Sequence, residues 1–215
     1  KNDERKLSVL IFKYIVDNEL VEMGKYFGTD GFRGEANVNL TAMHAFKIGR
    51  FIGWYYGRYH KCSVVIGKDT RRSSYMFEYA LVAGLTASGA DVYLLHVTTT
   101  PSVAYVVRTE NFDCGIMVSA SHNPYYDNGI KVMDGEGHKI SAEVENAMEK
   151  YIDGEMGELP FALQDKIGVA KDYAIGRNRY IGYLISLATR SYDGMRVGLD
   201  CSNGSTFNIA KNVFD

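Results

Sequence analysis

The stretch Ser63–Val97, SVVIGKDTRRSSYMFEYALVAGLTASGADVYLLHV, holds a strand, a helix and a second strand in direct succession. Its two ends, residues 63–67 and 91–97, are short apolar runs typical of strands buried in a sheet. Between them, residues 73–88 have helical spacing, begin among serines and end before Gly89. Strand–helix–strand units of this kind build a parallel sheet that is covered by helices.

The same alternation continues on both sides of this unit. We expect further helices over residues 40–59, capped near Thr41, over 101–108, and over 141–152, capped by Ser141, and further strands over 114–119 and 129–133. Residues 24–160 are therefore predicted to form a three-layer α/β/α domain with a mostly parallel mixed sheet.

Glycines and a proline between residues 154 and 168 predict a domain boundary. Beyond it we expect a helix over 174–188, a strand over 195–200 and a helix from about Thr206. One strand and two helices cannot bury a core, so residues 161–215 are expected to be the incomplete start of a second, similar domain.

Residues 1–23 are predicted to be an N-terminal extension. Their apolar stretch, residues 7–16, contains Lys13 and is too short to span a bilayer. We expect an amphipathic helical extension or a mis-set start upstream of Met23, with contact to a membrane or a partner as the alternative.

The composition excludes several classes of function. The net charge is −2, and lysines and arginines are scattered, which argues against nucleic acid as a partner. Cys62, Cys114 and Cys201 lie far apart with no paired spacing, so neither a disulfide framework nor a zinc site is predicted. Reduced thiols are typical of the cytoplasm, where we expect the protein to reside, without attachment to a membrane.

Reactive side chains are concentrated in one segment, Ser119–Lys131, SASHNPYYDNGIK. It follows a predicted strand, and open α/β sheets bind their ligands beyond the carboxyl ends of strands. The segment supplies hydroxyls, an imidazole, amides, a carboxylate and a lysine. Pro124 fixes its own φ angle, and Gly129 permits a turn that most residues could not make. This density of polar groups predicts a functional site.

Five segments, in this order, resemble the α-D-phosphohexomutase superfamily: YFGTDGFRG at 26–34, GKDTRRS at 67–73, TTPSVAYVV at 99–107, SASHNP with DNGIK at 119–131, and GLDCSNG at 198–204. The resemblance covers roughly residues 25–212. Within the superfamily, the first, fourth and fifth segments are most similar to the phosphoglucosamine mutase branch. Phe32 and Ser202 replace the usual isoleucine and alanine.

The resemblance implies an intramolecular phosphotransferase of the isomerase class. It would interconvert glucosamine 6-phosphate and glucosamine 1-phosphate through a phosphoserine enzyme and a 1,6-bisphosphate, which also acts as activator, and would feed amino-sugar nucleotides to peptidoglycan precursors. The remaining domains II–IV would be needed for turnover, so the 215 residues alone are expected to be inactive. A homodimer is left open.

Three other functions remain as alternatives. The chain could act as a phosphomannomutase or phosphoglucomutase, or it could be a non-catalytic phosphosugar-binding remnant. A serine hydrolase is disfavoured because the sequence has no GxSxG elbow.

The resemblance also assigns roles to four residues. Ser121 would carry the phosphoryl group, with Ser119 as the less favoured alternative. Lys131 and Arg33 would stabilise charge on the transferred group, and Lys131 could transfer a proton if its pKa were lowered. His122 would donate to a phosphate oxygen or orient the loop.

Two further features complete the expected site. Asp69 and Arg71 are predicted to form an ion pair or cap at a strand-to-helix turn, with positioning of phosphate or loop as the alternative. The resemblance implies one Mg²⁺, bound by the phosphate oxygen on Ser121 and by three aspartates of a DGDxDR-type loop. No such loop occurs in residues 1–215.

Overall fold

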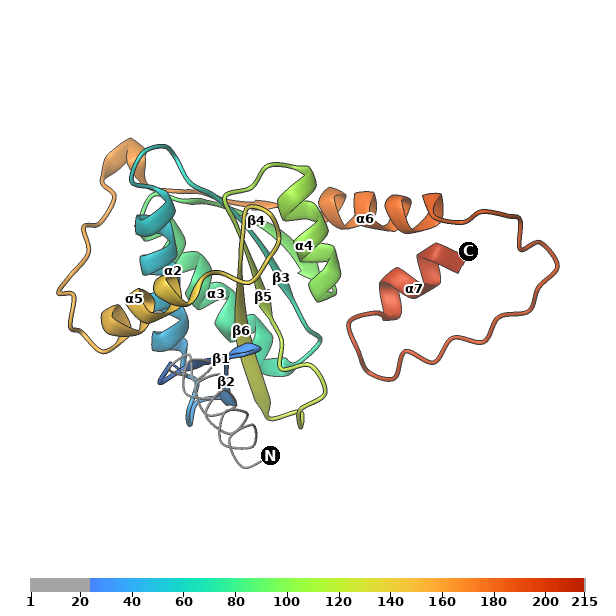
Figure 1. Ribbon diagram of the computed structural model, residues 1–215, viewed down its shortest axis with the longest axis horizontal. Coiled ribbons are helices and arrows are strands. Elements are labelled where there is room, and N and C mark those ends of the chain that lie inside the picture. The colour runs from blue at the N-terminus through green and yellow to red at the C-terminus, as the bar shows by residue number, and fades with distance from the viewer. Residues whose placement is uncertain (1–23, 215) are drawn as a thin grey trace, which may run out of the picture.

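The computed structural model describes residues 24–214, so the predicted extension over residues 1–23 lies outside the described residues. A seven-stranded sheet with the order β1-β2-β6-β5-β3-β4-β7 runs through the structure (Figure 1). The strands are β1 Phe27–Gly28, β2 Gly31–Glu35, β3 Ser63–Lys68, β4 Asp91–Val97, β5 Cys114–Val118, β6 Asp127–Asp134 and β7 Ala170–Asp172. The helices are α2 Ala42–Tyr56, α3 Arg72–Ala87, α4 Thr100–Thr109, α5 Ala142–Ile152, the short 3-10 helix η1 Gln164–Lys166, α6 Ala174–Ser186 and α7 Phe207–Phe214.

The sheet is divided into a parallel and an antiparallel half. Strand β3 pairs in parallel with β4 and β5, and β4 pairs in parallel with β7, whereas β5–β6, β6–β2 and β2–β1 are antiparallel. Parallel pairing is therefore less dominant than the sequence predicts. The reason is that only a short loop joins β5 to β6, and a parallel return would need a crossover connection.

Helices cover both faces of the sheet. Along β3, Val64 and Ile66 pack into the core under α2, α3 and α5, while Val65 packs into a second core with residues of α4. This alternation follows from the two-residue repeat of a strand. Tyr173, which caps α6, joins the second core, so α6 lies on the same face as α4 (Figure 1). The predicted three-layer α/β/α architecture is confirmed.

Helices α2 and α3 approach each other closely. A Cβ atom on Gly84 would lie 2.1 Å from the carbonyl oxygen of Phe46, and one on Gly49 would lie 2.5 Å from that of Leu81. Thr41 caps α2 as predicted, since its hydroxyl accepts from the His44 amide while His44 Nδ1 accepts from the Thr41 amide. Helices α2 and α3, which approach each other at these glycines, form one wall of the larger core.

The sequence did not predict three strands. Strands β1 and β2 lie within the segment YFGTDGFRG, and β7 extends the sheet beyond β4, past the predicted boundary at residue 160. Such two- to five-residue strands are too short to show a periodic pattern.

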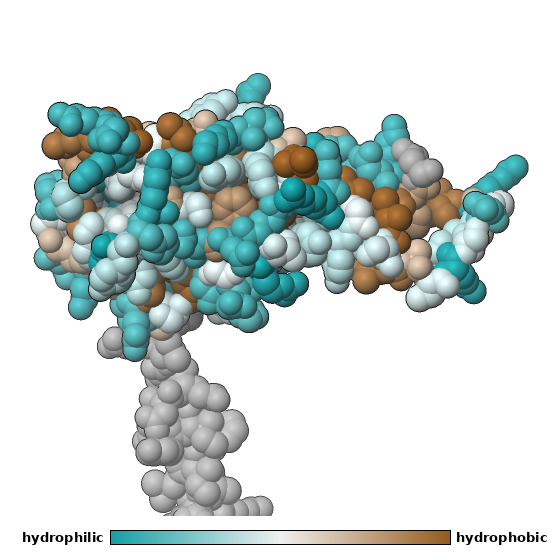
Figure 2. All heavy atoms as spheres, turned by 90° about the horizontal axis from the view of Figure 1, so that it is seen from above, coloured by the Kyte–Doolittle hydropathy of each residue, from teal (hydrophilic) through white to brown (hydrophobic). Residues whose placement is uncertain are grey.

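The strand predicted over residues 195–200 is wrong. No strand forms there, and Met195, Val197 and Leu199 are exposed. Figure 2 shows apolar side chains on the surface of this part of the molecule, beside α6 and α7. A strand forms only where a neighbour pairs with its backbone N–H and C=O groups, and no described strand reaches this segment. Among the described residues, no helix is both long enough and apolar enough to cross a membrane.

Candidate active site

A cavity of ≈ 320 Å³ opens beyond the carboxyl ends of β3 and β5. Its walls include the predicted loop, the start of α4 and the turn before α7; the lining residues are Asp69, Thr99, Thr100, Pro101, Met117, Ser119, Ser121, His122, Lys131, Gly204, Ser205 and Thr206. The structure thus brings Ser121, His122 and Lys131 together at one edge of the sheet. Parallel strands present their carboxyl ends on one side, which explains why β3 and β5 both contribute.

Ser121 lines this cavity. It is exposed and has φ +58°, a left-handed conformation that residues other than glycine seldom adopt. Its Oγ lies 3.3 Å from Nδ1 of the neighbouring His122. A strained backbone that presents a nucleophile is a common feature of functional sites, so the geometry supports Ser121 as the phosphoryl carrier.

Ser119 is engaged differently. It is buried, its Oγ accepts the Ser121 amide proton at 3.0 Å, and its hydroxyl donates to Asp69 Oδ2 at 3.1 Å. A hydroxyl that both donates and accepts a hydrogen bond within the protein is not free to attack a substrate. The geometry therefore favours Ser121 over Ser119.

Lys131 and Arg33 lie on the same face of the antiparallel half. Arg33 pairs with Gly129 on β6, and Lys131 is two residues further along that strand, which makes the two cations diagonal neighbours. Burial lowers the pKa of Lys131, the positive charge of Arg33 lowers it further, and Asp30 partly opposes both effects. Arg33 forms a 3.0 Å ion pair with the exposed Asp30. Lys131 lines the cavity, whereas Arg33 is not among its lining residues.

Gly129 lets the loop and β2 approach each other. A Cβ atom at this position would lie 2.7 Å from the carbonyl oxygen of Ser119 and 3.0 Å from Cγ of Arg33. Any side chain here would separate Arg33 from the base of the loop.

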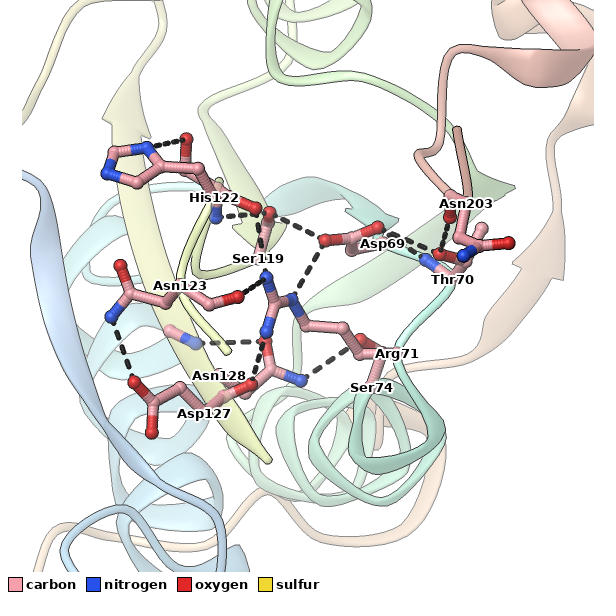
Figure 3. A network of polar contacts seen from close by, with 12 residues as sticks. Asp69, Thr70, Arg71, Ser74, Ser119, His122, Asn123, Asp127, Asn128 and Asn203 are labelled. Carbon is pink, nitrogen blue, oxygen red and sulfur yellow. Dashed lines mark hydrogen bonds and ion pairs between the residues drawn. The ribbon is translucent and has the colours of Figure 1, made fainter. Parts of the chain in front are cut away.

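Asn128 directly precedes the strand predicted over residues 129–133, and the structure includes it in β6. Its side chain is buried, and its Nδ2 donates at 3.0 Å to the hydroxyl of Ser74 at the start of α3 (Figure 3). It also donates to the hydroxyl of Ser73 at 2.9 Å. Its Oδ1 accepts the Gly129 amide proton. No sequence pattern indicated this link between β6 and α3, because the bonded residues lie far apart in the chain and meet only in the folded structure.

The described residues do not supply the acidic ligands of the implied Mg²⁺ site. Within residues 24–214 no three His, Cys, Asp or Glu side chains gather to hold a metal ion. Asp69 is the acidic residue of the cavity, but its Oδ1 accepts the Thr70 amide proton at 2.7 Å, and its Oδ2 accepts from Arg71 and Ser119. A carboxylate this fully engaged is a poor metal ligand.

A larger hollow, of ≈ 660 Å³, lies away from this site between the end of α2 and residues 160–166. Its Lys61 and His60 are paired with Asp91 and Asp113, respectively. Burial raises the pKa of its Cys62 thiol to about 12, which leaves that thiol unreactive. The smaller cavity, which contains Ser121 and Lys131, is therefore the stronger candidate site.

Comparison with known proteins shows the family to which the chain belongs. The family model described as phosphoglucomutase/phosphomannomutase, alpha/beta/alpha domain I, matches residues 24–158. The chain belongs to this family. The match contains the sheet strands β1 to β6 and the whole of the loop that bears Ser121.

Individual members of the family resemble the chain closely. It is 71% identical over 193 residues to the phosphoglucosamine mutase of Lachnoclostridium phytofermentans, covering 90% of this chain and 43% of the relative. It is 69% identical to the phosphoglucosamine mutase of Lachnospira eligens, covering 90% and 44%. A solved structure of a phosphoglucomutase/phosphomannomutase family protein from Burkholderia thailandensis superposes with a TM-score of 0.68 at 23% identity, covering 88% of this chain and 41% of that one. The last comparison supports the fold alone.

The chain spans less than half the length of the curated relatives it matches. Residues that complete the site in those relatives can therefore lie outside these 215 residues.

Proposed function

We propose that this chain carries the phosphoserine part of a phosphoglucosamine mutase, which interconverts glucosamine 6-phosphate and glucosamine 1-phosphate. The observation that carries the proposal is the exposed Ser121, held in a left-handed backbone conformation in the cavity that also contains Lys131. The relatives that are 69–71% identical and named phosphoglucosamine mutase support the choice of substrate.

In the proposed reaction, Ser121 rests as phosphoserine and gives its phosphoryl group to a hydroxyl of the substrate. The resulting 1,6-bisphosphate reorients and returns the other phosphoryl group to Ser121 Oγ. Phosphoryl transfer depends mainly on positioning and on stabilising charge, and the cations Lys131 and Arg33 would supply that charge. The lowered pKa of Lys131 suits it to hold and release the proton of the substrate hydroxyl.

His122 has a supporting role in this proposal. Its ring lies beside the Ser121 hydroxyl, so it can donate to an oxygen of the phosphoryl group once Ser121 is phosphorylated. We further propose Mg²⁺ as the cofactor, bound through that phosphate and by carboxylates other than those of the described residues. The activator would be a hexosamine 1,6-bisphosphate.

The partners of the chain are the phosphorylated hexosamine and the remaining domains of a longer protein, which the greater length of its relatives supports. The free cysteines support a reducing compartment, and we propose the cytoplasm. Homodimerisation remains a prediction.

The proposal is tested with the full-length protein and its Ser121→Ala variant, assayed with the 6-phosphates of glucosamine, mannose and glucose. We expect a preference for the glucosamine ester, and a loss of activity with loss of covalent phosphate in the variant, measured by intact mass. Preference for another hexose would keep the mechanism but change the substrate. Full activity of Ser121→Ala would exclude Ser121 as the carrier.

A further inference from the structure

The loop that bears Ser121 is curled around a single guanidinium group, that of Arg71 (Figure 3). One terminal nitrogen of Arg71 donates to the carbonyl oxygens of Pro124 and Asp127, at 2.5 and 2.8 Å. The other donates to those of Ser121 and Asn123, at 2.9 and 2.8 Å.

The remaining donor of Arg71, Nε–H, is bonded to Asp69 Oδ2 at 3.0 Å. A guanidinium has five N–H donors, and all of them are now accounted for. Asp69 also neutralises the charge, and both side chains are about nine-tenths buried. Arg71 therefore has neither a free donor nor unbalanced charge with which to bind a phosphate. Of the roles the sequence left open, the predicted ion pair is present, and the remaining contacts of Arg71 all go to the loop.

A second path leads from Asp69 to the same loop. The Ser119 hydroxyl donates to Asp69 and accepts the amide proton of Ser121. The amide of Asp69 in turn donates to the Val118 carbonyl at 2.8 Å, which ties the end of β3 to the end of β5. Asp69 is thus anchored in the sheet, and its carboxylate connects the sheet to the loop through both Arg71 and Ser119.

Together the two paths fix both backbone polar groups of Ser121. Its N–H is held by Ser119 and its C=O by Arg71. Fixing the peptide groups on both sides of a residue fixes its φ and ψ, and hence the direction of its Cα–Cβ bond. This accounts for the persistence of a left-handed conformation at a serine, which the surrounding structure must impose.

We propose that Arg71, Asp69 and Ser119 are positioning residues that hold the Ser121 hydroxyl in the orientation required for phosphoryl transfer. The inference rests on the proposed function only in taking Ser121 as the carrier. The three residues act through the backbone of Ser121. Arg71 is specifically required, because a lysine ammonium has three donors on a point charge and cannot satisfy four carbonyls and a carboxylate in one plane.

The test uses the full-length protein with Arg71→Lys, Arg71→Ala and Ser119→Ala, and with Arg72→Ala as the matched control. Arg72 is the adjacent arginine, exposed to solvent at the start of α3. Three quantities are measured: kcat and KM, hydrogen exchange of the peptide spanning residues 119–129, and the rate at which the dephosphorylated protein acquires phosphate from glucose 1,6-bisphosphate, followed by intact mass.

We expect each Arg71 variant to lower kcat and the phosphorylation rate by about 100-fold, the size of effect that a displacement of about 1 Å can have, with little change in KM. Exchange within residues 119–129 should accelerate while the rest of the sheet keeps its protection. Ser119→Ala should have a smaller effect in the same direction, and Arg72→Ala none. If Arg71→Ala fails to fold, Ser119→Ala, which removes a single oxygen, still decides the question.

Arg71→Lys or Ser119→Ala with unchanged kcat, phosphorylation rate and exchange would overturn the inference. So would a loss of kcat that is matched by equal loss of protection throughout the sheet, because that result would reflect global instability. If the wild type acquires phosphate but isomerises no hexose phosphate, the proposed function fails while the positioning role is still measured by the phosphorylation rate.

Discussion

A buried ion pair between Lys68 and Glu78 links the end of β3 to α3, and its contribution to the free energy of unfolding can be predicted. The exposed fractions of the two side chains are 3% and 1%, so the pair is shielded from the solvent that weakens surface ion pairs. Lys68 Nζ donates to Glu78 Oε2 and lies 3.9 Å from the centre of the Tyr75 ring. Lys68 also directly precedes Asp69, so this pair supports the strand end on which the site is built.

Replacing Glu78 by methionine keeps the volume of the side chain but leaves the Lys68 ammonium buried without a carboxylate. Breaking a buried ion pair in this way costs about 3–5 kcal/mol. Two features favour the lower end of that range. Glu78 Oε1 has no partner to lose, and the Tyr75 ring still stabilises the cation by about 1–2 kcal/mol. We therefore expect the free energy of unfolding to fall by about 3 kcal/mol.

The assay is urea unfolding of the 215-residue chain, followed by the fluorescence of its single tryptophan, Trp54, on α2. The double variant Lys68→Met/Glu78→Met should recover most of the loss, since an apolar pair of similar volume avoids the desolvation of both charges. The exposed Glu155→Met is the control and should change the stability by no more than about 0.5 kcal/mol. A loss below about 1 kcal/mol in the single variant, or a double variant as unstable as the single one, would refute the reasoning.

Two further predictions concern the electrostatics of the site and the packing of the helices. If protonated Lys131 is required, kcat/KM of the full-length protein falls as the pH rises through the lowered pKa of Lys131. Arg33→Met removes a repelling positive charge, so the pKa of Lys131 should rise. The alkaline limb of the residual activity should then move to higher pH. A limb that stays in place or moves to lower pH would show that another group titrates. Gly84→Ala puts a Cβ atom 2.1 Å from the Phe46 carbonyl oxygen, and the strain of forcing α2 from α3 should destabilise the chain by about 1–3 kcal/mol, measured as a lower Tm. An unchanged Tm would mean that the two helices separate at little cost.

The sequence by itself determined the layered α/β architecture and the position of most helices and central strands. Periodic apolar spacing, the caps Thr41 and Ser141, and the apolar run of β3 are local signals, and each predicted an element that the structure contains. The segment Ser119–Lys131 stood out for the same reason, since its polar side chains lie together in the chain. Local information sufficed wherever the cause of the structure was also local.

Tertiary structure alone decided the direction of β6, the edge strands β1, β2 and β7, and the absence of a strand over residues 195–200. A strand needs a hydrogen-bonded neighbour, and whether one is present is not encoded in the strand itself. The same applies to the role of Arg71. The sequence placed it two residues after an aspartate, but its carbonyl partners lie 50 to 56 positions further along the chain, and only the folded loop brings their oxygens within reach of one guanidinium.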